Sequence, residues 1–508
     1  MPETRSTPST TVDSPADLEV DPTPILRVLT VATFVVILNE TIMVNAVPQL
    51  MDSLHVSAQA AQWLSTAFML TMAVVIPTTG WFLHRLDRRA AFATAMGAFA
   101  LGTLLCAVAP GFALLLVGRI VQAVGTAIMM PLLMTTVMTL VPVEDRGRTM
   151  GNVSLAISVA PALGPTTSGL VLQFASWRWL FLLVLPMAVG MLLVGLRLLP
   201  RNHAGAAGPL DLLSLPLAAV GFGALVYGLS SFGGHSGPGA AEPVVSPVLA
   251  VAVGAAGVAL LVWRQLSLAR SGGAPLLDLR ALTHRNFALS MGIMCAAMMA
   301  MMGSMILLPL WLQDARGLSV LQAGLVMMPG GLMMGLLAPR IGRWYDRLGP
   351  RPLVVPGALL VLVALSVGTW AALDAPWWAF LLVHPAISFG LALLFTPLFS
   401  AGLGALPMDL YSHGSAILGT FQQVAAATGT ALAIALMSHR AGQLAADGHG
   451  PAESLAGGVS LAMAAGAGIF VVALALTLLV RRPDQEGAVP TEGDDAASQV
   501  TDAAPATA

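Results

Sequence analysis

Charged residues make up only 9% of this 508-residue chain, whereas a soluble domain carries roughly 25%. Lysine is missing, because all 23 basic residues are arginine, and no glycine-rich loop precedes a Lys-Ser or Lys-Thr pair. The only cysteines, Cys106 and Cys295, fall in apolar runs and suit packing better than a disulfide or a metal site. These absences argue against a soluble domain, an ATP-driven pump and a metalloenzyme, and we expect no cofactor and no nucleic-acid partner.

Apolar residues, by contrast, make up 57% of the chain, and the mean hydropathy is +0.83. They gather in runs long enough for helices of about 20 residues, the length that crosses a bilayer. We therefore predict an all-α, multi-pass membrane protein with fourteen spanning helices. These helices are expected at residues 25–47, 61–83, 90–109, 112–140, 149–171, 179–199, 211–231, 247–265, 286–311, 320–342, 352–372, 377–403, 413–437 and 457–480.

Arginine is distributed unevenly between the predicted spans. With the N-terminus in the cytoplasm, nineteen arginines fall on the cytoplasmic side, and only Arg178, Arg316 and Arg440 fall outside. Because cytoplasmic loops of membrane proteins are enriched in basic residues, we place the chain in the cytoplasmic membrane with both termini inside. Residues 1–24 and 483–508 are polar and acidic, do not resemble a signal peptide, and are expected to be disordered cytoplasmic tails.

A short arginine-rich loop occurs twice, 262 residues apart, each time between two apolar runs. Such a repeat indicates an internal duplication, which is how many secondary transporters are built. We divide the chain into a six-helix bundle at 25–200, two inserted, lipid-facing helices with a linker at 201–285, and a second six-helix bundle at 286–482. The loop residues are Gly80, Arg85 and Arg89 in the first copy and Gly342, Asp346, Arg347, Gly349 and Arg351 in the second.

The repeated loops suggest contacts that close the cytoplasmic side. Gly342 would let two helices approach closely, and Asp346 can accept hydrogen bonds from the N-terminus of a neighbouring helix. Arg347 and Arg351 can pair across the cytoplasmic face, so breaking these contacts would open the inside. The alternative is that the arginines only orient the chain in the membrane.

Three ionisable residues, Glu40, Arg119 and His384, lie well inside predicted spans, where hydrocarbon strongly disfavours charge. All three lie about 10–12 Å below the outer surface, so they can meet around one cavity. Glu40 is the only carboxylate at such a depth, and a buried carboxylate whose cationic partner can leave is a proton carrier. The alternative is a Glu40 locked to Arg119 as a structural pair. His384 can relay protons, bind substrate or simply form a hydrogen bond within its bundle.

Polar and flexible side chains inside the spans are candidates for a substrate cavity. Arg119 and Gln122 share a helix face, because they are three residues apart. Eleven methionines lie between Met291 and Met334, and methionine surfaces adapt to varied apolar ligands. For all of these side chains, ordinary packing is the alternative. The candidate cavity residues are Asn39, Gln122, Gln422, Gln423 and Met302.

The span at 149–171 combines small residues with prolines. Small residues recur there every four positions and form a smooth face for close helix packing. The prolines each remove a backbone hydrogen bond and bend the helix. Such a helix suits a sliding interface as well as static packing. The residues of this pattern are Pro161, Gly164, Pro165 and Gly169.

Taken in order, several segments resemble the fourteen-helix drug:proton antiporter branch of the major facilitator superfamily, the EmrB/QacA type. The resemblance covers roughly residues 25–480, and the ordered set of motifs is far more specific than any one of them. The resembling segments are 38–48, 119–125, 164–169, 177–181 and 406–423, of which the last is similar to lincomycin-resistance-type members.

The resemblance implies a major facilitator fold with alternating access and a substrate site between its two six-helix halves. It also implies that protons entering from outside drive drug export, and that the pattern at 161–169 favours exchange over symport. The chain departs from the family at two places. His84 stands where the superfamily pattern has aspartate, with Asp87 in place of glycine. The usual acid position is Asn39, and the shift to Glu40 turns the acid by about 100° around the helix.

We interpret the chain as a monomeric, proton-coupled antiporter that exports amphipathic drugs or other small organic compounds across the cytoplasmic membrane. In this hypothesis Glu40 carries the proton, Arg119 tunes it, and His384 is a partner. Three alternatives stay open: a dedicated exporter of one metabolite or antibiotic, a proton symporter for uptake, and a membrane receptor without transport. No nucleophile–base pair stands at a readable spacing, so we do not expect an enzyme.

Overall fold

The computed structural model describes residues 22–56, 58–200, 211, 213–234, 245–273 and 275–480, and every regular element within them is a helix. Most of the predicted N-terminal tail, residues 201–210 of the linker and the predicted C-terminal tail lie outside the described residues. The helices are α1 (Pro22–Ile42), α2 (Val47–Leu54), α3 (Ala58–Val75), α4 (Thr79–Arg85), α5 (Arg88–Ala107), α6 (Phe112–Leu140), α7 (Arg146–Phe174), α8 (Arg178–Leu198), α9 (Ser214–Gly234), α10 (Pro247–Arg270), α11 (Arg285–Leu310), α12 (Val320–Leu348), α13 (Arg351–Asp374), α14 (Phe380–Gly404), α15 (Tyr411–Ala446) and α16 (Pro451–Thr477). Short helical turns between them are η1 (Met43–Ala46), η2 (Ile76–Thr78), η3 (Val143–Asp145), η4 (Leu279–Thr283), η5 (Trp311–Ala315), η6 (Trp377–Ala379) and η7 (Met408–Leu410).

The all-α prediction is confirmed, and twelve helical segments of the described chain are long and apolar enough to cross a membrane. Two further long helices, α7 and α9, pack alongside these segments. α7 is less apolar, because it begins with two arginines and carries glycine, serine and threonine along its length. The predicted total of fourteen spans is compatible with this arrangement and stays a prediction.

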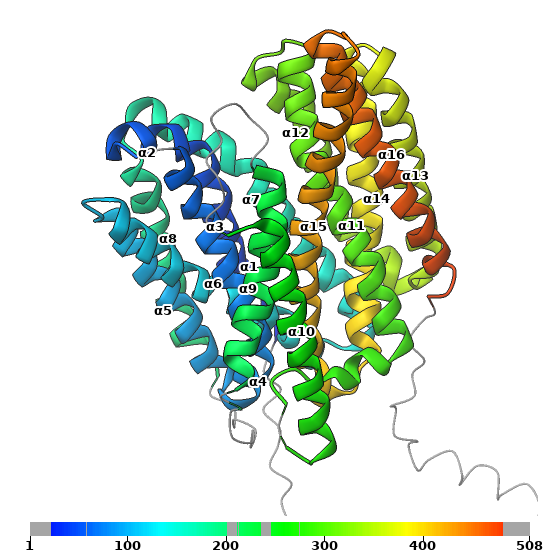
Figure 1. The fold of residues 1–508 in the computed structure, drawn as a ribbon. Helices are drawn as coiled ribbons and strands as arrows, with labels where there is room; N and C mark the ends of the chain where they lie inside the picture. Colours follow the sequence, from blue (N-terminus) through cyan, green and yellow to red (C-terminus); the bar gives the residue numbers. More distant parts are fainter. Residues whose placement is uncertain are drawn as a thin grey trace, which may run out of the picture.

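The helices form two bundles, coloured blue to cyan and green to red-orange in Figure 1. In the N-terminal bundle, α5 packs against α6 and α8, and α1 packs against α6, α7 and α8. In the C-terminal bundle, α13 packs against α14 and α16, and α11 packs against α14, α15 and α16. Buried aromatic side chains fill both interiors, such as Phe92 and Phe181 in the first and Phe287 and Phe470 in the second.

One end of the molecule carries both repeated loops, and we call it the arginine-rich end. It comprises the turn from α4 to α5, the turn from α12 to α13 and the start of α7. This end faces downward in Figure 1, where α4 lies near the bottom. The ribbons of the two bundles approach each other there and diverge toward the opposite end (Figure 1).

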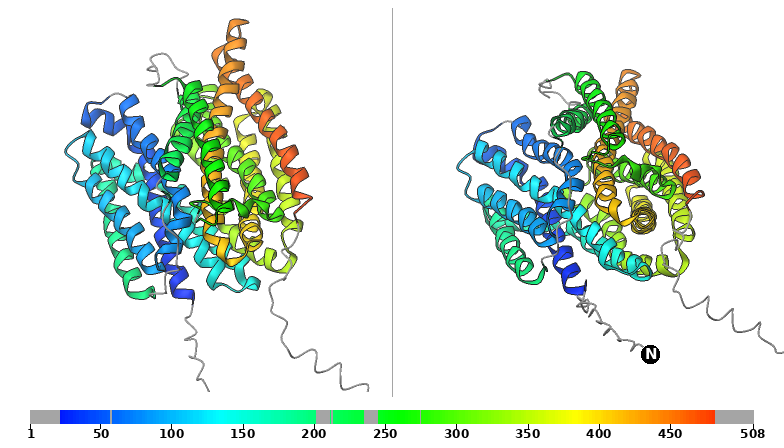
Figure 2. Two further views of the ribbon diagram at one scale, coloured as in Figure 1. Left: turned by 60° about the horizontal axis from the view of Figure 1, so that its bottom comes forward. Right: turned by 90° about the horizontal axis from the view of Figure 1, so that it is seen from below.

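We predicted that both inserted helices face the lipid, and the structure shows that one face of α9 packs against both bundles. It packs against α3 of the N-terminal bundle and against α15 of the C-terminal bundle, at one side of the seam between them (Figure 2). Phe222 and Val226 of α9 are buried in a small core with Ala73 of α3, and Trp63 stacks on Tyr227 at 6.1 Å between ring centroids. One face of α9 thus fits this seam with small and aromatic side chains, whereas Val220 of the same helix is 50% exposed, so contact of its other face with lipid stays a prediction. The largely exposed α10 fits the lipid-facing prediction.

A polar cluster ties the inserted helices to the rest of the chain at the arginine-rich end. Arg264 of α10 donates through Nε and Nη2 to the carboxylate of Asp211, at 3.0 Å each. These hydrogen bonds lower the pKa of Asp211 to about 2. Gln265 donates to the Ser214 hydroxyl at 2.6 Å and accepts from the backbone N–H of Leu276 at 2.7 Å, which holds the linker that leads to α11.

Candidate functional site

Arg119 lies in the interior of the N-terminal bundle and is only 2% exposed. Its Nη1 donates to Gln122 Oε1 at 3.0 Å, and its Nε donates to the carbonyl of Leu64 on α3 at 3.4 Å. The guanidinium carbon lies 4.1 Å from the ring centroid of Phe68, and the ring face stabilises the charge. Gln122 is held in turn by donating to the Thr103 hydroxyl of α5 at 2.8 Å. Arg119 is therefore a buried cation whose direct partners in the described chain are all neutral.

Glu40 lies on α1, two residues before the regular helix ends at Ile42 and continues as the turn η1. Its side chain is half-buried, and Arg119 is close enough for the two charges to interact. No salt bridge or hydrogen bond joins the Glu40 side chain to any residue that the structure describes. This conformation therefore does not contain the locked structural pair, and the role of Glu40 as a proton carrier stays a prediction.

The residue after Glu40 connects α1 to α7. Thr41 Oγ1 lies 3.4 Å from the backbone carbonyl oxygen of Ala160 on α7, while its closest acceptors are the carbonyl oxygens of Leu38 at 3.0 Å and Ile37 at 3.2 Å in its own helix. A Cβ at Gly164 would overlap Thr41 Oγ1, so only glycine permits this approach. The small-residue face of α7 thus packs against the helix that carries Glu40. Of the other residues in this pattern, Gly169 has open space where a Cβ would point, and the side chains of Pro161 and Pro165 lie outside the description.

α7 begins at the arginine-rich end, where it packs along α12 of the other bundle. Asp346 of α12 accepts hydrogen bonds from the backbone N–H groups of Gly147 and Arg148, both at 2.7 Å. These amides belong to the first turn of α7 and lack partners within the helix, so the carboxylate caps its positive end. A Cβ at Gly342 would overlap the carbonyl oxygen of Gly147, which shows how closely the two helices cross. The predicted geometry of Asp346 is present, while its role as a gate stays a prediction.

The other described hydrogen bonds between the two bundles also lie in the arginine-rich half of the molecule. Thr396 of α14 donates to the Ser154 hydroxyl of α7 at 3.1 Å. His84 Nε2 lies 3.0 Å from the backbone carbonyl oxygen of Asp409, in the turn before α15. Because both bundles are joined here, this conformation is closed at the arginine-rich end.

We expected two arginines of the second loop to pair across the bundles, and they do not. Arg351 donates to the backbone carbonyl of Leu478, which follows α16 in its own bundle, and Arg347 is exposed. Gly349 ends α12 with φ at 80°, a left-handed conformation that favours glycine. The interbundle contact of this loop therefore comes from the Asp346 carboxylate.

The first loop is anchored by other contacts. Gly80 packs against α15, where a Cβ would lie 2.7 Å from His413 Nδ1. The guanidinium of Arg85 lies 5.7 Å from the ring centroid of Trp81, and Arg89 is half-buried in the first turn of α5. This loop thus meets the C-terminal bundle through its glycine and through His84.

His384 lies apart from Glu40 and Arg119. It is near the start of α14 and contacts α12 of its own bundle at Gly330, where a Cβ would lie 2.5 Å from His384 Cδ2. Its Nδ1 is buried and has no hydrogen-bond partner within the described chain. The structure brings Glu40 and Arg119 together in the N-terminal bundle, while His384 belongs to the C-terminal bundle.

The predicted cavity amides of the N-terminal bundle are enclosed in this conformation. Gln122 is fully buried. Its Oε1 accepts from Arg119, and its Nε2 donates to the Thr103 hydroxyl. Asn39 is 2% exposed, and its Nδ2 has no hydrogen-bond partner among the residues described. Gln122 is therefore best understood as the residue that positions the Arg119 charge.

The two amides of α15 are more accessible. Gln422 and Gln423 are both half-buried. Gln423 lies one helical turn from Gly419, where a Cβ would lie 3.1 Å from Ile76 of the N-terminal bundle. Since residues four apart share a helix face, Gln423 lies on the face of α15 that is turned toward that bundle.

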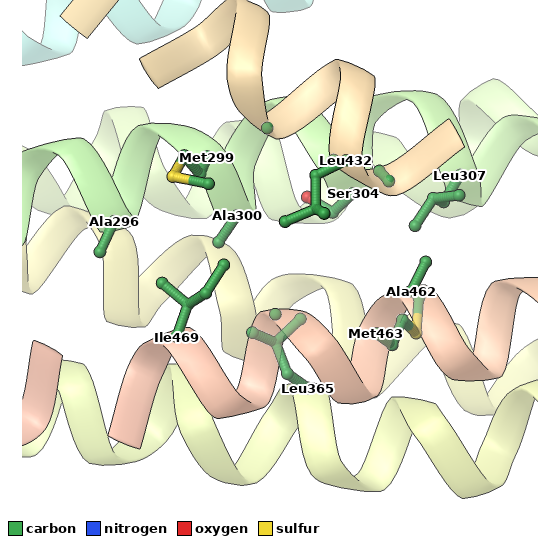
Figure 3. A pocket seen from close by; sticks show the side chains of 14 residues that line it. Ala296, Met299, Ala300, Ser304, Leu307, Leu365, Leu432, Ala462, Met463 and Ile469 are labelled. Atoms are coloured by element: carbon green, nitrogen blue, oxygen red, sulfur yellow. The ribbon is translucent and has the colours of Figure 1, made fainter. Parts of the chain in front are cut away.

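A small apolar pocket lies inside the C-terminal bundle, lined by α11, α13, α15 and α16 (Figure 3). Met299 and Met463 line it, and the hydroxyl of Ser304 already donates to the Met301 carbonyl at 3.0 Å. Met302, the predicted cavity methionine, is half-buried on α11 and is not among the residues that line this pocket. Because the pocket belongs to one bundle, we do not assign it to a substrate that passes between the two.

The Major Facilitator Superfamily model matches residues 29–430 of the chain. The chain belongs to the major facilitator superfamily. It is similar to the lincomycin resistance protein LmrB of Listeria monocytogenes serovar 1/2a, with 37% identity over 471 residues, 91% of this chain and 98% of the relative. It is also similar to the multidrug resistance protein B homolog of Mycobacterium tuberculosis, with 30% identity over 382 residues, 74% of this chain and 69% of the relative.

A solved structure agrees with this assignment at the level of the fold. The human organic anion transporter MFSD10 (TETRAN) superposes with a TM-score of 0.62 and 16% identity, over 90% of this chain and 99% of that one. As a superfamily member, the chain is a multi-pass membrane transporter of small molecules. The family resemblance stated from its motifs is confirmed.

Several residues of the site carry no signal that sequence reasoning used. Thr103 and Phe68 hold Arg119 and its partner, yet a threonine and a phenylalanine are ordinary in apolar helices. Thr41 had one usable signal, since it follows the deep carboxylate of Glu40 directly. His413 appeared within the segment at 406–423, and its contact with the first repeated loop emerges only from the fold.

Proposed function

We propose that this transporter is a proton-coupled antiporter that exports amphipathic drugs or other small organic compounds across the cytoplasmic membrane by alternating access. Glu40 carries the proton, and Arg119 tunes its binding. The arginine-rich end faces the cytoplasm, so this conformation is closed to the cytoplasm. The observation that carries the proposal is the half-buried Glu40 carboxylate under the charge of a buried arginine, with no salt bridge between them.

The surroundings of Glu40 suit a group that changes its protonation state. A carboxylate in a medium of low dielectric loses solvation, and a nearby cation offsets part of that loss. Arg119 is a stationary positive charge, because Gln122 and the Leu64 carbonyl hold its guanidinium. A small displacement of α1 relative to α6 therefore changes how strongly the cation favours the ionised carboxylate. This dependence couples proton binding to conformation.

α7 supplies the mechanical connection between the proton site and the closed end. Near its middle, α7 touches α1 at Thr41, the residue next to Glu40. At its start, the same helix is capped by Asp346 of the opposite bundle. A shift of α1 that accompanies proton binding is therefore transmitted along one helix to the contact that closes the arginine-rich end.

The nature of the cargo is supported by the relatives and by the polar groups between the bundles. The relatives are named for resistance to lincomycin and to multiple drugs. Half-buried amides on α15, of which Gln423 shares the face turned toward the N-terminal bundle, supply donors and acceptors for an organic compound. The orientation follows the positive-inside rule, because the loops at the arginine-rich end carry most of the arginines.

The proposal is tested in inside-out membrane vesicles with an imposed pH gradient, using ethidium and lincomycin as probes. Wild-type vesicles should take up at least one probe only with the gradient present. Glu40→Gln should lose this uptake by about tenfold or more, because the amide cannot carry a proton, whereas Glu40→Asp should keep part of it.

The matched control is Glu453→Gln, which removes a carboxylate that is 68% exposed at the start of α16. It should transport like the wild type. Uptake by Glu40→Gln at the wild-type level would remove Glu40 from the mechanism. Uptake by the wild type that ignores the pH gradient would contradict proton coupling itself.

A further inference from the structure

His84 occupies in the first repeated loop the place that Asp346 occupies in the second, since each lies four residues after the loop glycine. Both side chains also meet the start of a helix in the opposite bundle. Asp346 caps α7, whereas His84 Nε2 lies 3.0 Å from the Asp409 carbonyl oxygen, in the turn η7 before α15. One half of the duplicated closure thus uses a carboxylate, and the other uses an imidazole, the side chain on which many pH-dependent switches are built.

His413, in the first turn of α15, completes this joint. The rings of His84 and His413 lie 4.9 Å apart between centroids, with a tilt of 32°. His413 Nδ1 accepts the backbone N–H of Asp278 at 3.4 Å, from the linker that precedes α11. Gly80 leaves room for the ring, because a Cβ there would lie 2.7 Å from Nδ1. The histidine pair therefore joins α4, α15 and the linker at one point.

Charges of both signs surround the pair, and the carboxylate nearest to His413 is Asp278. Arg280 binds both carboxylate oxygens of Asp278, so that carboxylate is already matched. The amides at the start of α15 add the positive end of a helix dipole. The charged groups on the packed elements are Arg85 on α4, Asp87 and Arg88 at the start of α5, Asp278 and Arg280 on the linker, Asp409 in η7, and Arg146, whose guanidinium lies 5.7 Å from the Tyr411 ring centroid.

We propose that His84 and His413 form a second proton site, a latch that keeps the arginine-rich end closed while both rings are neutral and releases it when they are protonated. A proton on His413 Nδ1 removes the acceptor that the Asp278 N–H uses. A proton on His84 adds a second positive charge beside it, at the positive end of α15. The latch rests on the alternating access proposed above, and it depends neither on Glu40 nor on the identity of the cargo.

The size of the effect follows from proton linkage. If the pKa of an imidazole is one unit lower in the closed conformation than in the open one, protonation at acidic pH multiplies the open-to-closed ratio by ten. For a pair that gains charge at a helix N-terminus, we expect an increase of about tenfold between pH 8 and pH 5.5. Acidification of the cytoplasm would then favour opening toward the cytoplasm.

The test is a distance measurement by electron spin resonance on the full chain in lipid nanodiscs. Spin labels are placed at Val143→Cys and Leu479→Cys, which are 54% and 45% exposed at the arginine-rich ends of the two bundles. Cys295, the partly exposed native thiol, is replaced by alanine. Distance distributions are recorded from pH 8 to pH 5.5 without substrate.

Four variants share this background. In His84→Gln the amide still donates to the Asp409 carbonyl, and in His413→Gln the amide oxygen still accepts from the linker, but neither residue can be protonated. His439→Gln removes an exposed histidine at the far end of α15 and is the matched control. Asp346→Asn breaks the other half of the closure and serves as the positive control for opening.

The latch predicts a longer-distance population that grows with acidity in the wild type and in His439→Gln, and that stays constant in both latch variants. Equal acid responses in all of these proteins would overturn it. So would a wild type that ignores pH while Asp346→Asn opens, an outcome that leaves alternating access intact. If no variant opens at any pH, including Asp346→Asn, both the latch and the proposed alternating access fail.

Discussion

Replacing Asp346 by asparagine should weaken the closure of the arginine-rich end without unfolding either bundle. The carboxylate accepts from the Gly147 and Arg148 amides at 2.7 Å each. An asparagine keeps one acceptor oxygen and loses the other, together with the negative charge at the start of α7. A hydrogen bond to a charged group contributes about 1.5–3 kcal/mol, and the charge–dipole attraction about 0.3–1 kcal/mol.

Because Asp346 is half-buried, solvent screening reduces this sum to about 2 kcal/mol. A loss of that size multiplies the open-to-closed ratio by about 30. The assay is the spin-label distance between the two bundle ends at pH 8. The control is Asp145→Asn, since Asp145 precedes α7 but its side chain does not cap the helix. A distance distribution for Asp346→Asn that matches the control would refute this account of the closure.

Three further perturbations test the site and its surroundings. Gly164→Ala should slow transport about tenfold by forcing a Cβ against Thr41 Oγ1, and Thr41→Gly in the same chain should restore part of the flux. Gln122→Leu should lower Tm in detergent, because it leaves a buried donor of Arg119 unpaired at a cost of about 1–3 kcal/mol. Gln122→Glu should keep Tm and abolish transport, because a carboxylate in place of the amide oxygen that lies 3.0 Å from Arg119 neutralises that cation. The pKa of Asp211 in the folded protein is lowered to about 2, below the unfolded value of about 3.9. The ionised carboxylate therefore stabilises the fold above pH ~4, and this stabilisation is lost as the pH falls through 2. Asp211→Asn should lower Tm equally at pH 5 and pH 8.

The spans and the deep charges could be predicted because both follow from the cost of placing groups in hydrocarbon. A span needs about 20 apolar residues, and ionisable residues such as Glu40 and Arg119 stand out within one. The cap on α7 was also predictable in kind, because Asp346 ends a helix beside another arginine-rich turn. Its partners, Gly147 and Arg148, depend on the crossing of two helices that lie far apart in sequence.

Rotation about a helix axis and the choice of neighbours could not be predicted. His384 shares its depth with Glu40, but the rotation of α14 turns it against Gly330 of its own bundle. The position of α9 at the seam could not be predicted, because its glycine, alanine and leucine suit contact with lipid and with protein equally well. The neutral partners of Arg119, such as Phe68, follow from packing, and packing leaves no mark in a single sequence.

The most direct test of the central claim uses purified protein in proteoliposomes, with ethidium or lincomycin flux measured under imposed pH gradients of either sign. If proton exchange drives transport through Glu40, probe flux should reverse its direction when the gradient is reversed, and Glu40→Gln should show no gradient-driven flux in either direction. Flux of the same sign under both gradients, or reversal that persists in Glu40→Gln, would contradict the account.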